Sequence, residues 1–143
     1  MTPRARALQS LIRLRKTEVD QARAELGRVL AHERAAEMRL AHSRQQLQSE
    51  QFEVSAGRTS MEDFLAWLPV GRDAIERAHR LVLEAQQASD QARAGLTQAN
   101  AALKAAEAVL ARWREEEREK EARREQNEVD DLSRRVRGVF GIG

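Results

Sequence analysis

Two long runs of regularly spaced apolar residues constrain the fold of this chain more than any other feature. In the first run, from about residue 4 to residue 57, ten of the fourteen residues at heptad positions a and d are apolar. Its a positions are Ile12, Val19, Leu26, Glu33, Leu40, Leu47 and Val54, and its d positions are Leu8, Arg15, Ala22, Val29, Ala36, Ser43 and Glu50. A repeat sustained over seven heptads predicts one continuous helix with a coiled-coil seam along one face.

The second run, from about residue 72 to residue 137, has small residues along one edge of its seam. Its a positions are Ile75, Val82, Ser89, Leu96, Leu103 and Leu110, and its d positions are Ala78, Ala85, Ala92, Ala99, Ala106 and Trp113. A row of alanines needs larger residues opposite it, and the a positions of the first run supply them. The predicted fold is therefore all-α, a long antiparallel two-helix coiled-coil hairpin. We expect a single domain over residues 1–143, with a frayed tail at 138–143.

The connection between the two runs, residues 58–71, is predicted to hold a short helix of its own at about 61–68. Ser60 is suited to cap the start of that helix. Pro69 and Gly71 are residues that end helices, so they would separate the segment from the second long helix. Phe64 and Trp67 lie at this hairpin tip. They are either an apolar plug that closes the hairpin or an exposed contact site, and the sequence leaves both interpretations open.

Two pairing registers fit the heptads. In the first, facing residues have numbers that sum to 132, which places Arg15 opposite Glu117 and Ser43 opposite Ser89. In the second the numbers sum to 125, which places Arg15 against Leu110. Because an unpaired charge buried beside a leucine is costly, we expect the first register.

Composition and spacing argue against chemistry at a closed site. The chain has no cysteine, which excludes disulfides and thiolate metal ligands, and its seven glycines form no phosphate-binding loop. His32 and His42 are ten residues apart, about three helical turns, which is too far to share a metal. We therefore expect no enzyme activity, no cofactor, no metal and no small-molecule substrate. The chain shows neither a signal peptide nor an apolar stretch near the roughly 20 residues of a membrane span.

The charge pattern argues against nucleic acid as a partner. The net charge is only +2, and the sequence pI of 9.6 reflects the predominance of arginine among the 25 basic residues. Acidic residues alternate with the arginines, and aromatic residues are only 3% of the chain. Two alternatives remain open. A nucleic-acid-associated coiled coil would show a basic stripe and steep salt dependence, whereas a structural scaffold would self-associate into dimers or bundles. A hairpin that satisfies its own seam should be monomeric.

The motifs at the two ends of the chain resemble a known family. The first is Leu8-x-x-Leu11-Ile-Arg-Leu-Arg-Lys16, followed by Glu18-x-x-x-Ala22-x-x-x-Leu26, and the last is Glu128-Val-Asp-Asp-Leu132 with basic residues after it. With the hairpin between them, these motifs are similar to those of the flagellar export protein FliJ. They are also similar to those of the related stalk proteins of virulence-type type III secretion. The choice between the two export systems stays open here.

The resemblance implies a cytoplasmic, non-enzymatic stalk or adaptor at the periphery of the membrane export apparatus. Its implied partners are a hexameric export ATPase, the export gate membrane protein and export chaperones. The arginine-rich end of the chain suits an acidic ring interior, and the residues expected to contact the ring are Arg112, Arg114, Arg118, Arg123, Arg124 and Leu132. The implied gate-binding face matches Leu68, Ile75 and His79, while Arg72 departs from an apolar position of that pattern.

Overall fold

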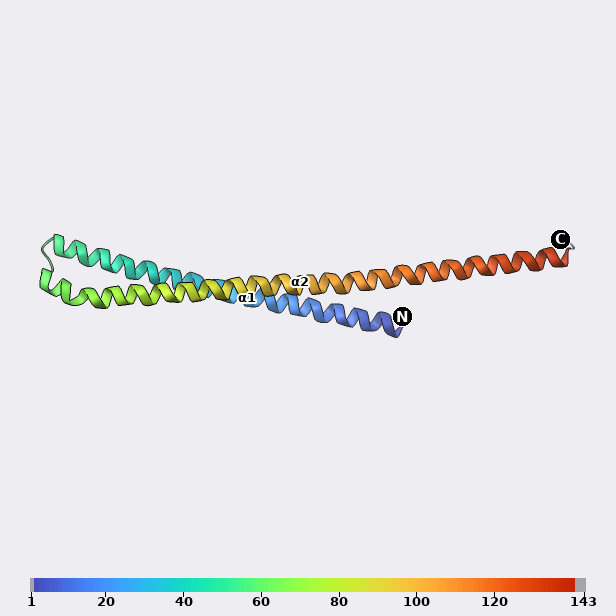
Figure 1. The fold of residues 1–143 in the computed structure, drawn as a ribbon, viewed down its shortest axis with the longest axis horizontal. Helices are drawn as coiled ribbons and strands as arrows, with labels where there is room; N and C mark the ends of the chain where they lie inside the picture. The colour runs from blue at the N-terminus through green and yellow to red at the C-terminus, as the bar shows by residue number, and fades with distance from the viewer. Residues whose placement is uncertain (1, 141–143) are drawn as a thin grey trace. The chain divides into compact units, whose positions relative to one another are not determined.

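A computed structural model describes residues 2–140, and within them it contains two α-helices and no strand. Helix α1 is Pro3–Ser55 and helix α2 is Met61–Val139 (Figure 1). The predicted all-α two-helix fold is confirmed. The chain divides into two compact units, a terminal unit of Met1–Lys16 with Ala101–Gly143 and a turn unit of Thr17–Asn100. Each unit is described by itself below.

Helix α1 begins at a capped proline. The Thr2 hydroxyl accepts a hydrogen bond from the backbone N–H of Ala5 at 3.1 Å, and the Thr2 carbonyl accepts one from the N–H of Arg6 at 3.1 Å. Pro3 is the first helical residue, where its missing N–H costs nothing. The helix therefore starts one residue earlier than the expected residue 4.

Helix α1 ends in a Schellman motif. Gly57 has a φ of 75°, the left-handed conformation that glycine adopts without steric penalty. The N–H of Gly57 donates to the carbonyl of Val54 at 3.0 Å, and the N–H of Arg58 donates to the carbonyl of Glu53 at 2.9 Å. These two bonds satisfy carbonyls that the last turn would otherwise leave without partners. The helix therefore ends at Ser55, two residues before the expected residue 57.

Helix α2 starts at Met61 and continues through both residues that were expected to interrupt it. The Ser60 hydroxyl accepts a hydrogen bond from the N–H of Asp63 at 3.1 Å, so the predicted cap is confirmed. The separate short helix at 61–68 is wrong, because that segment forms the first turns of α2. Proline removes one backbone hydrogen bond, but ending the helix there would also break the seam packing that follows. Gly71 is buried because it lies under the ring of Trp67.

In the turn unit the two helices pack antiparallel along the predicted seam (Figure 1). Leu40 and Ala78 belong to one buried cluster, and so do Ala36 and Val82. These cluster members fit a register in which facing residue numbers sum to 118, which sets a large side chain against an alanine in each pair. The predicted size complementarity of the two seams is thus present in the core of this unit.

The two expected registers, with sums of 132 and 125, are both wrong. Ser43, expected to face Ser89, instead lines a groove with Ala74 and Ala78. Ser89 is only 1% exposed, and its hydroxyl donates to the carbonyl of Gln86 on its own helix at 3.0 Å. Since this bond satisfies the hydroxyl locally, Ser89 needs no polar residue across the seam.

The register error follows from the error in the connection. A sum of 132 centres the hairpin on residue 66, whereas a sum of 118 centres it on residue 59, within the five residues 56–60 that join the helices. The difference, 132 − 118 = 14, is two whole heptads. The same faces therefore meet in both registers, and only the identity of the facing residues changes.

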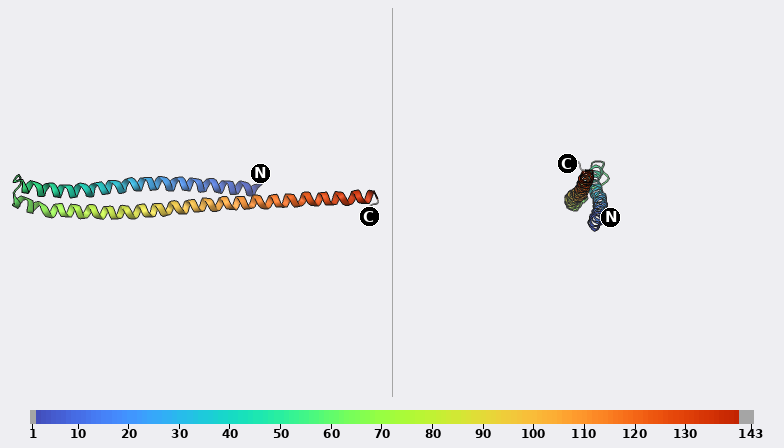
Figure 2. Two further views of the ribbon diagram at one scale, coloured as in Figure 1. Left: turned by 90° about the horizontal axis from the view of Figure 1, so that it is seen from above. Right: turned by 90° about the vertical axis from the view of Figure 1, so that its right-hand side faces the viewer.

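The terminal unit contains the same pairing and then a helix without a neighbour. Its buried residues are Ala5, Ala106 and Leu110. Past the point where α1 begins, α2 continues alone, and every residue from 118 to 140 is exposed (Figure 2). We call residues 118–139 the overhang. The expected tail at 138–143 is helical as far as Val139, and residues 141–143 lie outside the described part of the chain.

Arg15 also lies in the terminal unit. There Arg4 shares a groove with Trp113, and their numbers sum to 117. Sums of 117 and 118 bring Arg15 level with Ala102 and Leu103 rather than with Glu117, so the expected ion pair is wrong. Arg15 is half-buried. An arginine can bury its aliphatic stem against apolar side chains while its guanidinium reaches the surface, so a half-buried Arg15 is compatible with the seam.

Neither helix, within the described residues, combines the length and apolar character that crossing a membrane requires.

Candidate functional site

The residues expected to bind the export gate lie together at the start of α2. Leu68 and Ile75 are half-buried, and Ile75 packs against the buried cluster of the turn unit. Arg72 and His79 are exposed on the same edge of the helix. Pro69 does not break the stretch, because α2 is continuous through it. The structure thus brings the predicted residues onto one edge, where the two apolar ones also serve the hairpin seam.

The aromatic residues at the hairpin tip pack mainly along their own helix. The ring centroids of Phe64 and Trp67 are 6.2 Å apart and the rings are inclined by 33°. Gly71 lies under the Trp67 indole, and a Cβ at residue 71 would come within 2.5 Å of that ring. Both rings are half-buried. The exposed large apolar side chains near this end are others, for which no site was predicted: Phe52, Met61, Leu65 and Val70.

The end of α1 is held by one arginine that makes two contacts. The Arg58 guanidinium donates to both carboxylate oxygens of Glu53, at 2.7 and 3.0 Å, and its Cζ lies 5.4 Å from the centroid of the Phe52 ring. The hydrogen bond from Arg58 lowers the pKa of the Glu53 carboxyl, and the charge of Arg58 acts in the same direction. Glu53 raises the pKa of Arg58 in turn. This clamp could not be predicted from helical spacing, because residues five apart do not face each other in a helix.

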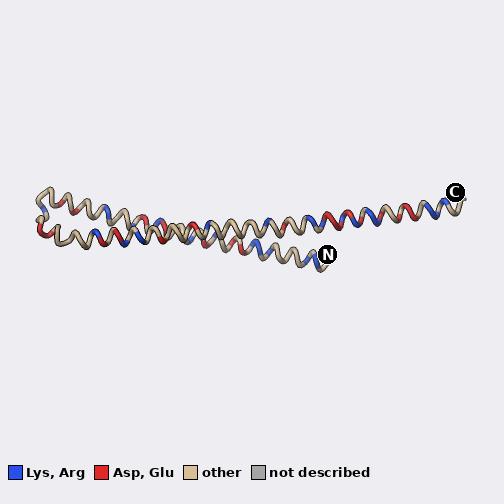
Figure 3. The backbone as a smooth tube through the Cα atoms, viewed as in Figure 1, with Lys and Arg blue, Asp and Glu red and all other residues tan. Residues whose placement is uncertain are grey.

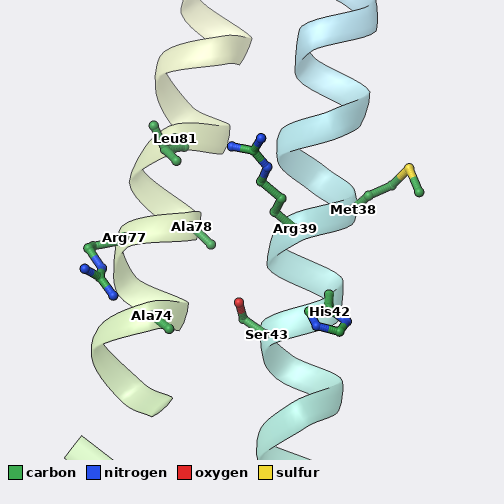
Figure 4. Close-up of a pocket in the computed structure, with 8 residues that line it drawn as sticks. All are labelled: Met38, Arg39, His42, Ser43, Ala74, Arg77, Ala78 and Leu81. Atoms are coloured by element: carbon green, nitrogen blue, oxygen red, sulfur yellow. The ribbon is translucent and has the colours of Figure 1, made fainter. Parts of the chain in front are cut away.

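A shallow apolar groove follows the seam of the turn unit (Figure 4). Its floor is formed where three small residues meet, Ser43 on α1 with Ala74 and Ala78 on α2. Small residues on both helices leave the seam hollow at this level. Arg39 reaches across toward α2 in Figure 4, and the other lining residues are Met38, His42, Arg77 and Leu81. The alanine row predicted close helix packing but not this hollow.

The arginines expected to contact a ring are all exposed on α2 in the terminal unit, and acidic residues alternate with them (Figure 3). Arg118 pairs with Glu115 at 2.8 Å, and Arg124 pairs with Glu121 at 3.4 Å. Exposed pairs at this spacing support a helix that has no tertiary contacts. The expected ring residues are therefore accessible, although two of the arginines already have carboxylate partners.

The overhang also carries exposed aliphatic side chains. Val129, Leu132, Val136 and Val139 are 57%, 61%, 47% and 80% exposed. Leu132 was predicted as a partner-binding residue; the three valines were not assigned a role. Their spacing of three and four residues was the available signal, but it falls outside the heptad phase of the seam.

The described residues contain no cluster of three or more histidine or acidic side chains that could hold a metal ion. His32 and His42 are both exposed on α1, and His79 is exposed on α2.

Comparison with known proteins identifies a family. The sequence matches the flagellar FliJ protein family over residues 4–137, which is nearly the whole chain. No curated protein and no solved structure matches it.

Proposed function

Because the chain belongs to the flagellar FliJ protein family and is therefore a component of the flagellar export apparatus, we propose that it acts there as a stalk and adaptor. Its terminal unit docks in the hexameric export ATPase, and the start of α2 engages the cytoplasmic side of the export gate. In this role the chain couples the export ATPase to the export gate and helps to deliver export chaperones. It does no chemistry of its own.

The observation that carries the docking proposal is the overhang. A helix of 22 residues with no neighbouring element has no core of its own to stabilise, so its side chains are available to another protein. The arginines at residues 118, 123 and 124 of the overhang, with those at 112 and 114 just before it, can form bidentate contacts with carboxylates of a ring interior. The unpaired state of α2 beyond α1 is what a segment that enters a central opening requires.

The proposal for the gate rests on the edge of α2 near the turn. Arg72 and His79 are exposed on that edge and flank the seam residue Ile75. A partner helix or loop that approaches this edge would contact the polar side chains of Arg72 and His79 and the partly exposed apolar side chain of Ile75. Such a mixture of polar and apolar contacts is typical of protein interfaces. We expect His79→Ala to weaken gate binding without changing the stability of the hairpin.

Ring docking is tested by charge reversal. We expect Arg123→Glu with Arg124→Glu to weaken binding of the purified chain to the hexameric export ATPase and to reduce its stimulation of ATP hydrolysis. The matched control is Arg34→Glu with Arg44→Glu, which changes the same charge at exposed positions of the turn unit. Binding and stimulation that are unchanged in the Arg123/Arg124 variant would contradict electrostatic docking.

A further inference from the structure

The apolar residues of the overhang do not continue the seam of the hairpin. At 100° per residue, Val129, Leu132, Val136 and Val139 centre about 90° around α2 from the last seam residues, Leu110 and Trp113. On the heptad repeat the four fall at positions b and f. The positions that continue the seam as far as residue 134 are all polar: Glu117, Lys120, Arg124, Asn127, Asp131 and Arg134.

This change of face separates two functions along one helix. A longer α1 would meet only polar side chains beyond residue 117, so the hairpin seam ends in the sequence as well as in the structure. The four aliphatic residues form a second surface, which we call the overhang stripe: Val129, Leu132, Val136 and Val139. Aliphatic side chains at regular helical spacing on an exposed helix indicate a surface that another protein covers.

The stripe is too small to serve a second copy of this chain. Four aliphatic side chains over three turns bury much less than the roughly 800 Å² per partner of a standard interface. A two-helix contact would also leave the arginines uncovered, because they lie on several other faces of α2. Arg112 and Arg123 lie on the side away from the stripe, and Arg114 and Arg118 lie near it. An occupant that surrounds the helix reaches the stripe and the arginines together.

We infer that the overhang stripe is the main contact of this chain with the ATPase ring and that the arginines around it serve mainly for approach and orientation. The inference rests on the proposed docking function and makes it more specific. Two of the arginines keep carboxylate partners on their own helix, so binding a ring through them requires breaking those pairs. The stripe has no such competing contact in the described structure. Buried aliphatic contacts carry affinity, whereas exposed charges chiefly raise the association rate.

The test is the affinity of the full chain for the purified hexameric export ATPase of the same organism, measured by fluorescence anisotropy. We expect Leu132→Glu to weaken binding by at least about tenfold. Leu132→Ile, which keeps an aliphatic side chain, should bind nearly as tightly as the wild-type chain. The matched control is Asn127→Glu, which adds the same charge to the overhang about 140° around the helix from Leu132. Both positions are exposed on a helix with no neighbouring element, so neither change should unfold the hairpin.

The possible results separate the inference from the proposed function. If the wild-type chain binds the ring and only Leu132→Glu loses affinity, the result supports both the stripe inference and the proposed ring docking. Wild-type binding that Leu132→Glu leaves unchanged, or that both variants weaken equally, overturns the stripe and leaves ring docking standing. An absence of wild-type binding overturns ring docking itself. Concentration-dependent dimerisation of the wild-type chain that Leu132→Glu abolishes would assign the stripe to a second copy and also overturn the inference.

Discussion

The seam of the turn unit and the overhang belong to one continuous helix, yet they use apolar residues in opposite ways. In the turn unit, aliphatic side chains and alanines alternate across the seam and are buried: Val82 and Ala85 are 6% and 3% exposed. In the overhang, aliphatic side chains of similar size remain about half exposed or more. The helical spacing is the same in both regions. What differs is the face of α2 that carries these residues and whether α1 lies opposite that face, so helical spacing alone does not decide burial here.

The sharpest way to test this difference is to truncate one leucine in each region. Leu40 is 8% exposed in the seam, and we expect Leu40→Ala to lower the free energy of unfolding by about 3 kcal/mol, through lost burial and a residual cavity. Leu132→Ala should change it by less than about 0.5 kcal/mol, because the residue contacts no other element. Urea denaturation followed by circular dichroism measures both. Equal losses in the two variants would mean that the overhang is packed in solution.

The alanine row permits a second comparison, by overpacking. Ala85 is 3% exposed, and we expect Ala85→Leu to destabilise the hairpin by about 2 kcal/mol because the helices must move apart. Ala94 is exposed on the same helix in the same unit. Ala94→Leu makes the same chemical change outside the seam and should be nearly neutral. If Ala85→Leu were tolerated as well as Ala94→Leu, close approach of the helices at this layer would be disproved.

Two glycines in α1 and its end should respond in opposite directions to the same substitution. Gly57 has a left-handed backbone, so Gly57→Ala should destabilise the hairpin by roughly 1 kcal/mol. Gly27 lies within α1, and a Cβ there would meet nothing within 4 Å. Gly27→Ala should therefore stabilise by up to about 1 kcal/mol. Thermal melting of the two variants checks the signs, and a stabilising Gly57→Ala would contradict the turn geometry.

The smallest expected effect is the acid response of the clamp at the end of α1. Arg58 lowers the pKa of Glu53 in the folded state, so their ion pair stabilises the fold above the ordinary carboxyl range. This contribution is lost as the pH falls through the lowered pKa. We expect Arg58→Gln to melt slightly below wild type at neutral pH and the gap to narrow in acid. A small difference in melting temperature that does not depend on pH should persist in acid, because the wild-type chain keeps the contact between Arg58 and Phe52 that Arg58→Gln removes.

The control for this prediction is a double-mutant cycle. In a Glu53→Gln background, Arg58→Gln should have the same effect at every pH, because the carboxylate that titrates has been removed. A gap between wild type and Arg58→Gln that stays constant through the carboxyl range would contradict the ion pair.

The heptads predicted the helices and their facing surfaces because burial along a seam follows sequence periodicity directly. They could not predict the register. A shift of two heptads keeps every a and d residue in the seam, so the length of the turn decides between registers. That length was misjudged because Pro69 and Gly71 were interpreted as helix ends. In the structure Pro69 is tolerated within α2, and Gly71 makes room for the Trp67 ring. Both effects depend on neighbours that a local pattern does not contain.

The candidate sites were predictable to different degrees. The exposed arginines and Leu132 could be named from the end of the seam, since polar residues at a and d positions show where pairing stops. The groove at Ser43 depends on which small residues face each other, and therefore on the register. The clamp between Glu53 and Arg58 depends on the Schellman geometry at Gly57, which brings residues five apart together.

The most direct test of the hairpin register uses paired cysteines, because the natural chain has none. Arg39 and Leu81 line the same groove, so an Arg39→Cys, Leu81→Cys variant should form an intramolecular disulfide rapidly under mild oxidation. An Arg39→Cys, Gly95→Cys variant moves the second thiol two heptads along the same edge of α2, about 21 Å away. We expect efficient closure of the first pair and none of the second. Closure of the 39–95 pair with failure of the 39–81 pair would show that the helices pair with numbers summing near 132 and would contradict the structure described here.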